Sequence, residues 1–230
     1  SQMLMPAFRW WNDAEGNRQN LTEMNDDVAA ILERHGFAGV VIFAQNAAET
    51  EATARFLNDV QTANAKGENR TQLLTAIDQE GGSVTRLGQG TAFPGNMALG
   101  AVNDLTATAD AARTIGAELK ALGLNFDFAP VVDVNSNPAN PVIGTRSFSD
   151  DAQTVAKQGA AFMGALMENG TISTLKHFFL KRKVFADSLI HFSAVIFFDS
   201  SCPDFRRIVH AKHAPSLKDK MNRANQIVWS

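Results

Sequence analysis

The sequence predicts an α/β fold: a (β/α)8 TIM-type barrel that is incomplete, with about five βα units followed by an atypical tail. Apolar runs of strand length alternate with segments of helical periodicity, which favours parallel βαβ units. Three strands end in polar groups, namely Asp78, Lys176–His177 and, through its loop, Arg146, and barrels gather such groups at one face. No Gly-x-Gly-x-x-Gly follows the first strand, which weakens the alternative of a doubly wound open sheet.

The predicted elements follow one another with mostly short connections. Strands are expected at 3–8, 39–44, 73–77, 125–130 and 171–177, where apolar residues run together. Helices are expected at 21–35, 49–65, 104–122 and 151–169, each with an apolar stripe at helical spacing. Thr22 is the expected cap of the first helix. The long loop 131–148 is expected to carry function or to be disordered.

The stretch from Leu73 to Arg86 organises the chain. Its apolar run enters an acid-rich turn, Asp78-Gln-Glu, and Gly81-Gly82 then lets the backbone bend where side chains would block it. A strand that ends in such groups delivers them to the rim where α/β folds bind ligands. For any one such turn, the alternative is an ordinary strand-to-loop connection whose polar side chains are merely solvated. Two later stretches repeat the arrangement, which favours a site.

Composition excludes several classes of protein. The net charge of -3 gives no signal for binding nucleic acid. Cys202 is the only cysteine, so a disulfide framework and a zinc cluster are not expected. No apolar run approaches the length of a membrane span. The N-terminus is not a signal peptide and lacks an initiator Met, so the compartment stays open between cytoplasmic and secreted with the signal removed.

The composition changes sharply near residue 178. Residues 1–177 hold 12 basic and 20 acidic side chains, a net charge of -8, whereas residues 178–230 hold 9 and 4, a net charge of +5. All 16 glycines lie in the first part. We therefore divide the chain into a partial barrel, 1–177, and an atypical tail, 178–230. A shifted reading frame, a truncation or a grafted segment would each explain the change, and the exposed sheet edges of a partial barrel favour self-association.

Four motifs resemble one known family. Ile77–Arg86, Phe126–Val134, Ile143–Phe148 and Leu175–Phe178 are similar, in order and spacing, to the N-terminal barrel of glycoside hydrolase family 3. The likeness covers about residues 1–178 and is strongest to the β-N-acetylhexosaminidases. It implies a retaining glycosidase that removes terminal N-acetylglucosamine from glycans or cell-wall fragments and needs neither cofactor nor metal.

The resemblance also implies which side chains contact the sugar. They are strand-end and loop residues that can bond ring hydroxyls: Asp78, Arg86, Arg146, Lys176 and His177. The alternative for the two arginines is an ion pair at the rim, which contributes little. The alternative for Lys176–His177 is a basic pair that satisfies carbonyl groups at the end of the barrel.

The chain departs from the family where catalysis should follow. Members carry Pro-Gly-His-Gly after Lys-His-Phe, then Asp-Ser-His, and a His of this loop is thought to donate the proton. Here the first motif is missing, and Leu189 follows Asp187-Ser188 in place of the second His. His191 is a candidate substitute. Asp199 follows an apolar run as the family's nucleophile does, but it comes too early in the chain.

Two classes of function remain, and the catalytic residues stay unassigned. The first is a glycosidase of the hexosaminidase type, impaired in this chain. The second is a non-catalytic sugar-binding or remnant protein that keeps the sugar subsite without the acid and the nucleophile. The family motifs support the first, and Leu189 supports the second.

Overall fold

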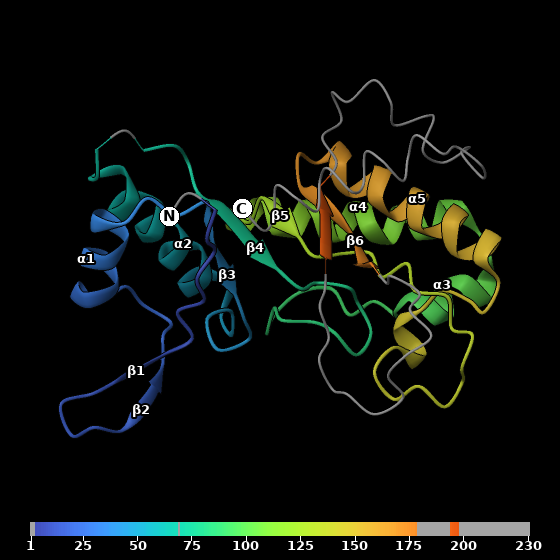
Figure 1. Cartoon of the computed structure of the whole chain (residues 1–230), viewed down its shortest axis with the longest axis horizontal. Coiled ribbons are helices and arrows are strands. Elements are labelled where there is room, and N and C mark those ends of the chain that lie inside the picture. The colour runs from blue at the N-terminus through green and yellow to red at the C-terminus, as the bar shows by residue number, and fades with distance from the viewer. Residues whose placement is uncertain (1–2, 69, 179–193, 198–230) are drawn as a thin grey trace. The chain divides into compact units, whose positions relative to one another are not determined.

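Five strands form the main sheet of the structure, a computed structural model that describes residues 3–68, 70–178 and 194–197 (Figure 1). In spatial order they are β3 (Gly39–Ile42), β4 (Leu74–Ile77), β5 (Phe126–Asp127), β6 (Ile172–Phe178) and β7 (Ala194–Phe197). The strands β3 to β6 are parallel. Their spatial order follows the chain, as in a barrel, and does not reverse as in a doubly wound sheet. The predicted α/β class with a parallel sheet is therefore confirmed.

Strand β7 breaks the parallel pattern. It pairs antiparallel with β6, so that Ala194 lies beside Phe178 and Phe197 beside Thr174. A (β/α)8 barrel requires a parallel strand at this place. Within the described residues the sheet is therefore not closed into a barrel. Asp199 and His191 lie outside the described residues.

Helices alternate with the parallel strands. They are α1 (Asp26–Arg34), α2 (Thr50–Ala65), α3 (Asn96–Val102), α4 (Leu105–Leu122) and α5 (Ala152–Glu168), and α4 packs along α5 (Figure 1). The side chains of Asn25, Asp104 and Asp151 accept hydrogen bonds from backbone N–H groups of the first turns of α1, α4 and α5. The first helix thus begins at Asp26 and not at Leu21, because Asn25, rather than Thr22, supplies the cap.

Two predicted strands differ from the structure. Residues 3–8 form no regular strand, although the carbonyl groups of Leu4 and Pro6 accept hydrogen bonds from Ala38 and Val41 at β3. Pro6 has no N–H that could donate a hydrogen bond back to β3, so a regular β-ladder cannot form. The strand predicted at 125–130 is reduced to β5, which is two residues long, and Pro130 follows it.

Several further elements were not predicted, among them the helix α3, which begins at Asn96 inside the stretch 93–98 that the sequence predicts to be a loop. Strands β1 (Trp10–Asn12) and β2 (Arg18–Asn20) form an exposed antiparallel hairpin. Within the long loop 131–148, residues Gly144–Arg146 form the 3₁₀ helix η1. The Ser147 hydroxyl donates to the Asp133 carbonyl at 2.6 Å and so ties the two ends of this loop together. The loop is therefore ordered, and it positions Arg146.

One hydrophobic core lies between the sheet and its helices. Phe162 of α5 is fully buried against Phe148, with 6.4 Å between the ring centres. Phe126 of β5 is buried beside Phe128 at 5.0 Å. The core therefore anchors α5 and the end of the long loop to each other, and with them the residues that follow β5. In the described ranges no helix has the length and hydropathy to cross a membrane.

Every described residue belongs to one compact unit, which ends at residue 197. The boundary predicted between the partial barrel, 1–177, and the tail, 178–230, stays a prediction, since most of the tail lies outside the described residues.

Candidate functional site

Charged side chains from β4 and β6 meet at the carboxyl end of the sheet. Asp78 follows β4, and Lys176 lies near the end of β6. The Lys176 ammonium lies 2.5 Å from Asp78 Oδ1 and 2.6 Å from Glu80 Oε1. Lys176 therefore bridges two carboxylates. The alternative in which it satisfies carbonyl groups at the end of the barrel does not describe these contacts.

Arg146 joins this cluster from η1. Its Nε donates to Glu80 Oε2 at 2.9 Å and its Nη2 to Glu80 Oε1 at 2.7 Å, a bidentate pair. The Glu80 side chain is only 1% exposed and that of Arg146 18%, so the carboxylate of this ion pair is buried and the guanidinium is partly exposed. Glu80 also raises the pKa of the Arg146 guanidinium above its ordinary value, because its carboxylate accepts hydrogen bonds from the charged form.

Arg86 is held more loosely. Its Nη2 lies 3.7 Å from Asp78 Oδ2. The loop that carries Arg86 is tied down by Gln79, whose side-chain oxygen accepts the backbone N–H groups of Arg86 and Leu87 at 2.8 and 3.3 Å. The Arg86 guanidinium lies 5.9 Å from the Phe43 ring centre. Asp78 Oδ2 therefore faces a cation without a close hydrogen bond to it.

The turn between these residues depends on glycine, as the sequence predicts. Gly81 and Gly82 both have positive φ angles, 83° and 60°. A Cβ on Gly82 would lie 2.9 Å from the Cα of Gly95, which is too close. The Glu80 N–H donates to the Val84 carbonyl at 2.9 Å and closes the turn. The turn thus aims Asp78 and Glu80 at the same cluster.

His177 and Asp133 form a second pair beside Arg146. Asp133 Oδ2 lies 2.7 Å from His177 Nδ1 and accepts the His177 backbone N–H at 3.0 Å. His177 Nε2 lies 3.4 Å from Arg146 Nη2, which can only donate. These contacts assign the proton of the ring to Nδ1, with Nε2 as an acceptor.

Asp127 lies fully buried behind the cluster. Its Oδ1 accepts the Gln79 N–H at 2.9 Å, whereas its buried Oδ2 has no hydrogen-bond partner among the described residues. Burial raises the pKa of the Asp127 carboxyl well above its ordinary value. Asp127 therefore stabilises the turn after β4 through its hydrogen bond with Gln79, and it presents no exposed group to a ligand.

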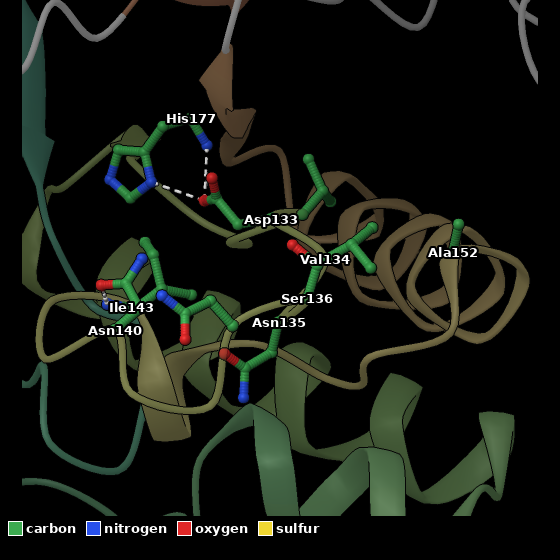
Figure 2. A pocket seen from close by; sticks show the side chains of 10 residues that line it. Asp133, Val134, Asn135, Ser136, Asn140, Ile143, Ala152 and His177 are labelled. Carbon is green, nitrogen blue, oxygen red and sulfur yellow. Dashed lines mark hydrogen bonds and ion pairs between the residues drawn. The ribbon is translucent and has the colours of Figure 1, made fainter. Parts of the chain in front are cut away.

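A cavity of about 570 Å³ adjoins the His177–Asp133 pair. Figure 2 shows the two side chains joined at one side of it, with Asn135 and Asn140 from the long loop among its other walls. The Asn135 side-chain oxygen is buried without a hydrogen-bond partner in the described part of the chain. The cavity thus combines amide groups and apolar walls next to the charged cluster.

The structure brings the five predicted residues together: Asp78, Arg86, Arg146, Lys176 and His177. Contact of these residues with a sugar stays a prediction. The sequence did not single out Glu80 or Asp133 for the site, although Glu80 forms ion pairs with two of the cations. Its position two residues after Asp78 in the acid-rich turn was the available signal. No group of three or more His, Cys, Asp or Glu placed to hold a metal ion occurs in the described ranges.

The family follows from comparison with known proteins. Residues 1–198 match the glycosyl hydrolase family 3 N terminal domain. The chain belongs to this family. Over 188 residues it is 40% identical to a β-hexosaminidase A of Pseudoalteromonas piscicida, covering 77% of this chain and 31% of that protein. It is 33% identical over 174 residues to a β-hexosaminidase of Idiomarina loihiensis, covering 74% of this chain and 51% of the relative.

Solved structures of family 3 enzymes resemble this chain as well. A family 3 β-N-acetylglucosaminidase from Paenibacillus sp. has a TM-score of 0.69 and 39% identity, covering 77% of this chain and 32% of its own. NagZ from Neisseria gonorrhoeae, solved in complex with N-trifluoroacetyl-D-glucosamine, has a TM-score of 0.65 and 26% identity, covering 76% of this chain and 49% of its own. The chain thus spans about a third to a half of the length of these four relatives.

Proposed function

We propose that this family 3 chain binds a terminal N-acetylglucosamine residue through Asp78, Arg86, Arg146, Lys176 and His177. The observation that carries the proposal is the carboxylate of Asp78. Its side chain is 25% exposed, and its Oδ2 lies 3.7 Å from Arg86 Nη2, which is beyond hydrogen-bond distance. A partly exposed carboxylate oxygen of this kind can accept a hydrogen bond from a sugar hydroxyl.

The neighbouring groups supply the complementary donors and an acceptor. Arg146 and Lys176 are held in place by Glu80 and are strong, charge-assisted donors. His177 Nε2 is an acceptor beside them. A hexose presents adjacent hydroxyls that both donate and accept, so a cluster of mixed character fits it better than a uniformly basic one. The names of the relatives, β-hexosaminidases and β-N-acetylglucosaminidases, support this choice of sugar.

The reaction proposed for the site is retaining hydrolysis that removes terminal N-acetylglucosamine from glycans or cell-wall fragments. Retention requires a carboxylate nucleophile and a separate proton donor. We propose that the activity is impaired in this chain, because Leu189 stands where a His is expected and cannot carry a proton. The two residues considered for these roles, His191 and Asp199, lie outside the described residues.

The alternative is a protein that binds the sugar without cleaving it. The same residue, Leu189, favours it. Both functions share the Asp78 cluster and differ only in turnover. The test combines calorimetric titration with N-acetylglucosamine and an assay of aryl N-acetylglucosaminide cleavage on the full chain. Binding with slow turnover supports the impaired glycosidase, binding without turnover supports the alternative, and absence of binding contradicts both.

A further inference from the structure

The Glu80 side chain is almost fully buried. Its side chain is 1% exposed, against 25% for Asp78 two residues earlier. Both of its oxygens are engaged: Oε2 accepts from Arg146 Nε, and Oε1 accepts from Arg146 Nη2 and lies 2.6 Å from Lys176 Nζ. Asp78, by contrast, keeps Oδ2 without a close hydrogen bond. The two carboxylates of one turn therefore differ in what they can do.

We propose that Glu80 is the positioning residue of the site, which fixes the guanidinium of Arg146 and the ammonium of Lys176 relative to each other. The proposal rests on the proposed function for its effect on sugar binding. Arg and Lys side chains are long and flexible, and one buried carboxylate that holds both removes this freedom before a ligand arrives. Glu80 itself is fixed by its N–H bond to the Val84 carbonyl.

Counting the hydrogens on Arg146 shows what the positioning achieves. A guanidinium has five N–H donors. Nε–H and one Nη2–H bond Glu80, the other Nη2–H faces His177 Nε2, and one Nη1–H bonds the Val142 carbonyl at 3.1 Å. One Nη1–H remains. Lys176 donates one of its three hydrogens to Asp78 Oδ1 and forms an ion pair with Glu80 Oε1 at 2.6 Å. Arg146 thus offers a single remaining donor of set direction to a ligand.

Two variants separate this role from simple charge balance. Glu80→Gln keeps the shape and removes the charge, whereas Glu80→Asp keeps the charge and shortens the reach. Positioning predicts that both variants free the Arg146 side chain. A role limited to neutralising the two cations predicts that Glu80→Asp behaves as the wild type. Asp78→Asn is the matched control, because it changes the neighbouring carboxylate without touching the Arg146 contacts.

The readout that does not depend on sugar is the Arg146 Nε–H signal in ¹⁵N NMR spectra of the full chain, assigned with Arg146→Lys. We expect slow exchange with water in the wild type and in Asp78→Asn, and fast exchange in both Glu80 variants. N-acetylglucosamine titrations should show affinity weakened by about tenfold or more in the Glu80 variants, the usual effect of losing charge-assisted hydrogen bonds. Circular dichroism checks that each variant is folded.

The outcomes separate the two proposals. Slow Arg146 Nε–H exchange in a folded Glu80 variant, or fast exchange in Asp78→Asn, overturns the positioning role. If Glu80→Gln does not fold, Glu80→Asp decides alone, and if neither folds, Glu80 is a folding residue and the proposal is wrong. A wild type that binds no N-acetylglucosamine contradicts the proposed function, while the exchange of Arg146 Nε–H still tests Glu80.

Discussion

Replacing Asp78 by Ala should abolish measurable binding of N-acetylglucosamine. The variant removes the one partly exposed carboxylate of the cluster and leaves Lys176 paired with Glu80 at 2.6 Å, so no buried cation is left without a partner. A hydrogen bond to a charged group contributes about 1.5–3 kcal/mol, and 1.4 kcal/mol corresponds to a tenfold change in affinity. One such bond to Oδ2 therefore predicts a loss of about 10- to 150-fold.

Isothermal titration calorimetry with N-acetylglucosamine measures this loss directly. Asp59→Ala is the matched control, because it makes the same change of charge on an exposed position of α2 away from the cluster. The control should bind as the wild type does. A dissociation constant in Asp78→Ala that equals that of the control would show that the sugar does not use this carboxylate, and the argument from its exposed Oδ2 would fail.

Three further predictions concern catalysis, packing and pH. Cleavage of an aryl N-acetylglucosaminide should be slow or absent, because the expected general acid is missing and such an acid typically contributes about 10²–10⁴-fold to the rate. Normal turnover would contradict this prediction. If Asp199→Ala then abolished the turnover, Asp199 would be the nucleophile, and if the turnover depended on His191, His191 would be the acid. Phe162→Ala should lower the free energy of unfolding by about 3–5 kcal/mol in urea titrations, since the ring is fully buried, and a loss below about 1 kcal/mol would contradict its place in the core. Burial raises the pKa of Asp127 above the ordinary value of 3.8. Between the ordinary and the raised pKa, the folded chain keeps a proton on Asp127 that the unfolded chain releases. The free energy of unfolding therefore falls as pH rises through this range. Asp127→Asn cannot ionise, so its free energy of unfolding relative to the wild type should increase with pH over this range, and a constant difference would contradict the raised pKa.

The parts of the fold that the sequence predicted well are those in which local and global preferences agree. The runs at β3 and β4 are continuous and apolar because both faces of a parallel strand are covered. Strand β5 was predicted too long, because two residues suffice once the Asn125 side chain bonds the Thr75 N–H at 2.8 Å and takes over part of the ladder. The direction of β7 could not be predicted, since an apolar run carries no information about the strand it joins.

The site also contains residues that the sequence predicts and one that it does not. Asp78 and Lys176 stand at strand ends, and the rule for parallel sheets brings them together. Glu80 was missed because its partners are distant in the chain: Arg146 lies 66 residues further along, and Lys176 lies further still. From the sequence alone, a carboxylate in an acid-rich turn that will be buried cannot be told from one that will be exposed. The sequence shows the charges of the turn, whereas their partners and burial follow from the tertiary structure.

The span of these ion pairs has a consequence for the chain as it is made. Lys176 reaches Asp78 across 98 residues, so during synthesis at about 5–20 residues per second the two acids of the turn wait about 5–20 s for this cation. Arg146 arrives earlier and meets Glu80 first. In the nascent chain Asp78 can therefore pair only with Arg86, and Glu80 only with Arg146, and both carboxylates gain their shared partner Lys176 when β6 has emerged. A sugar that binds the cluster would report that this last parallel strand is in place.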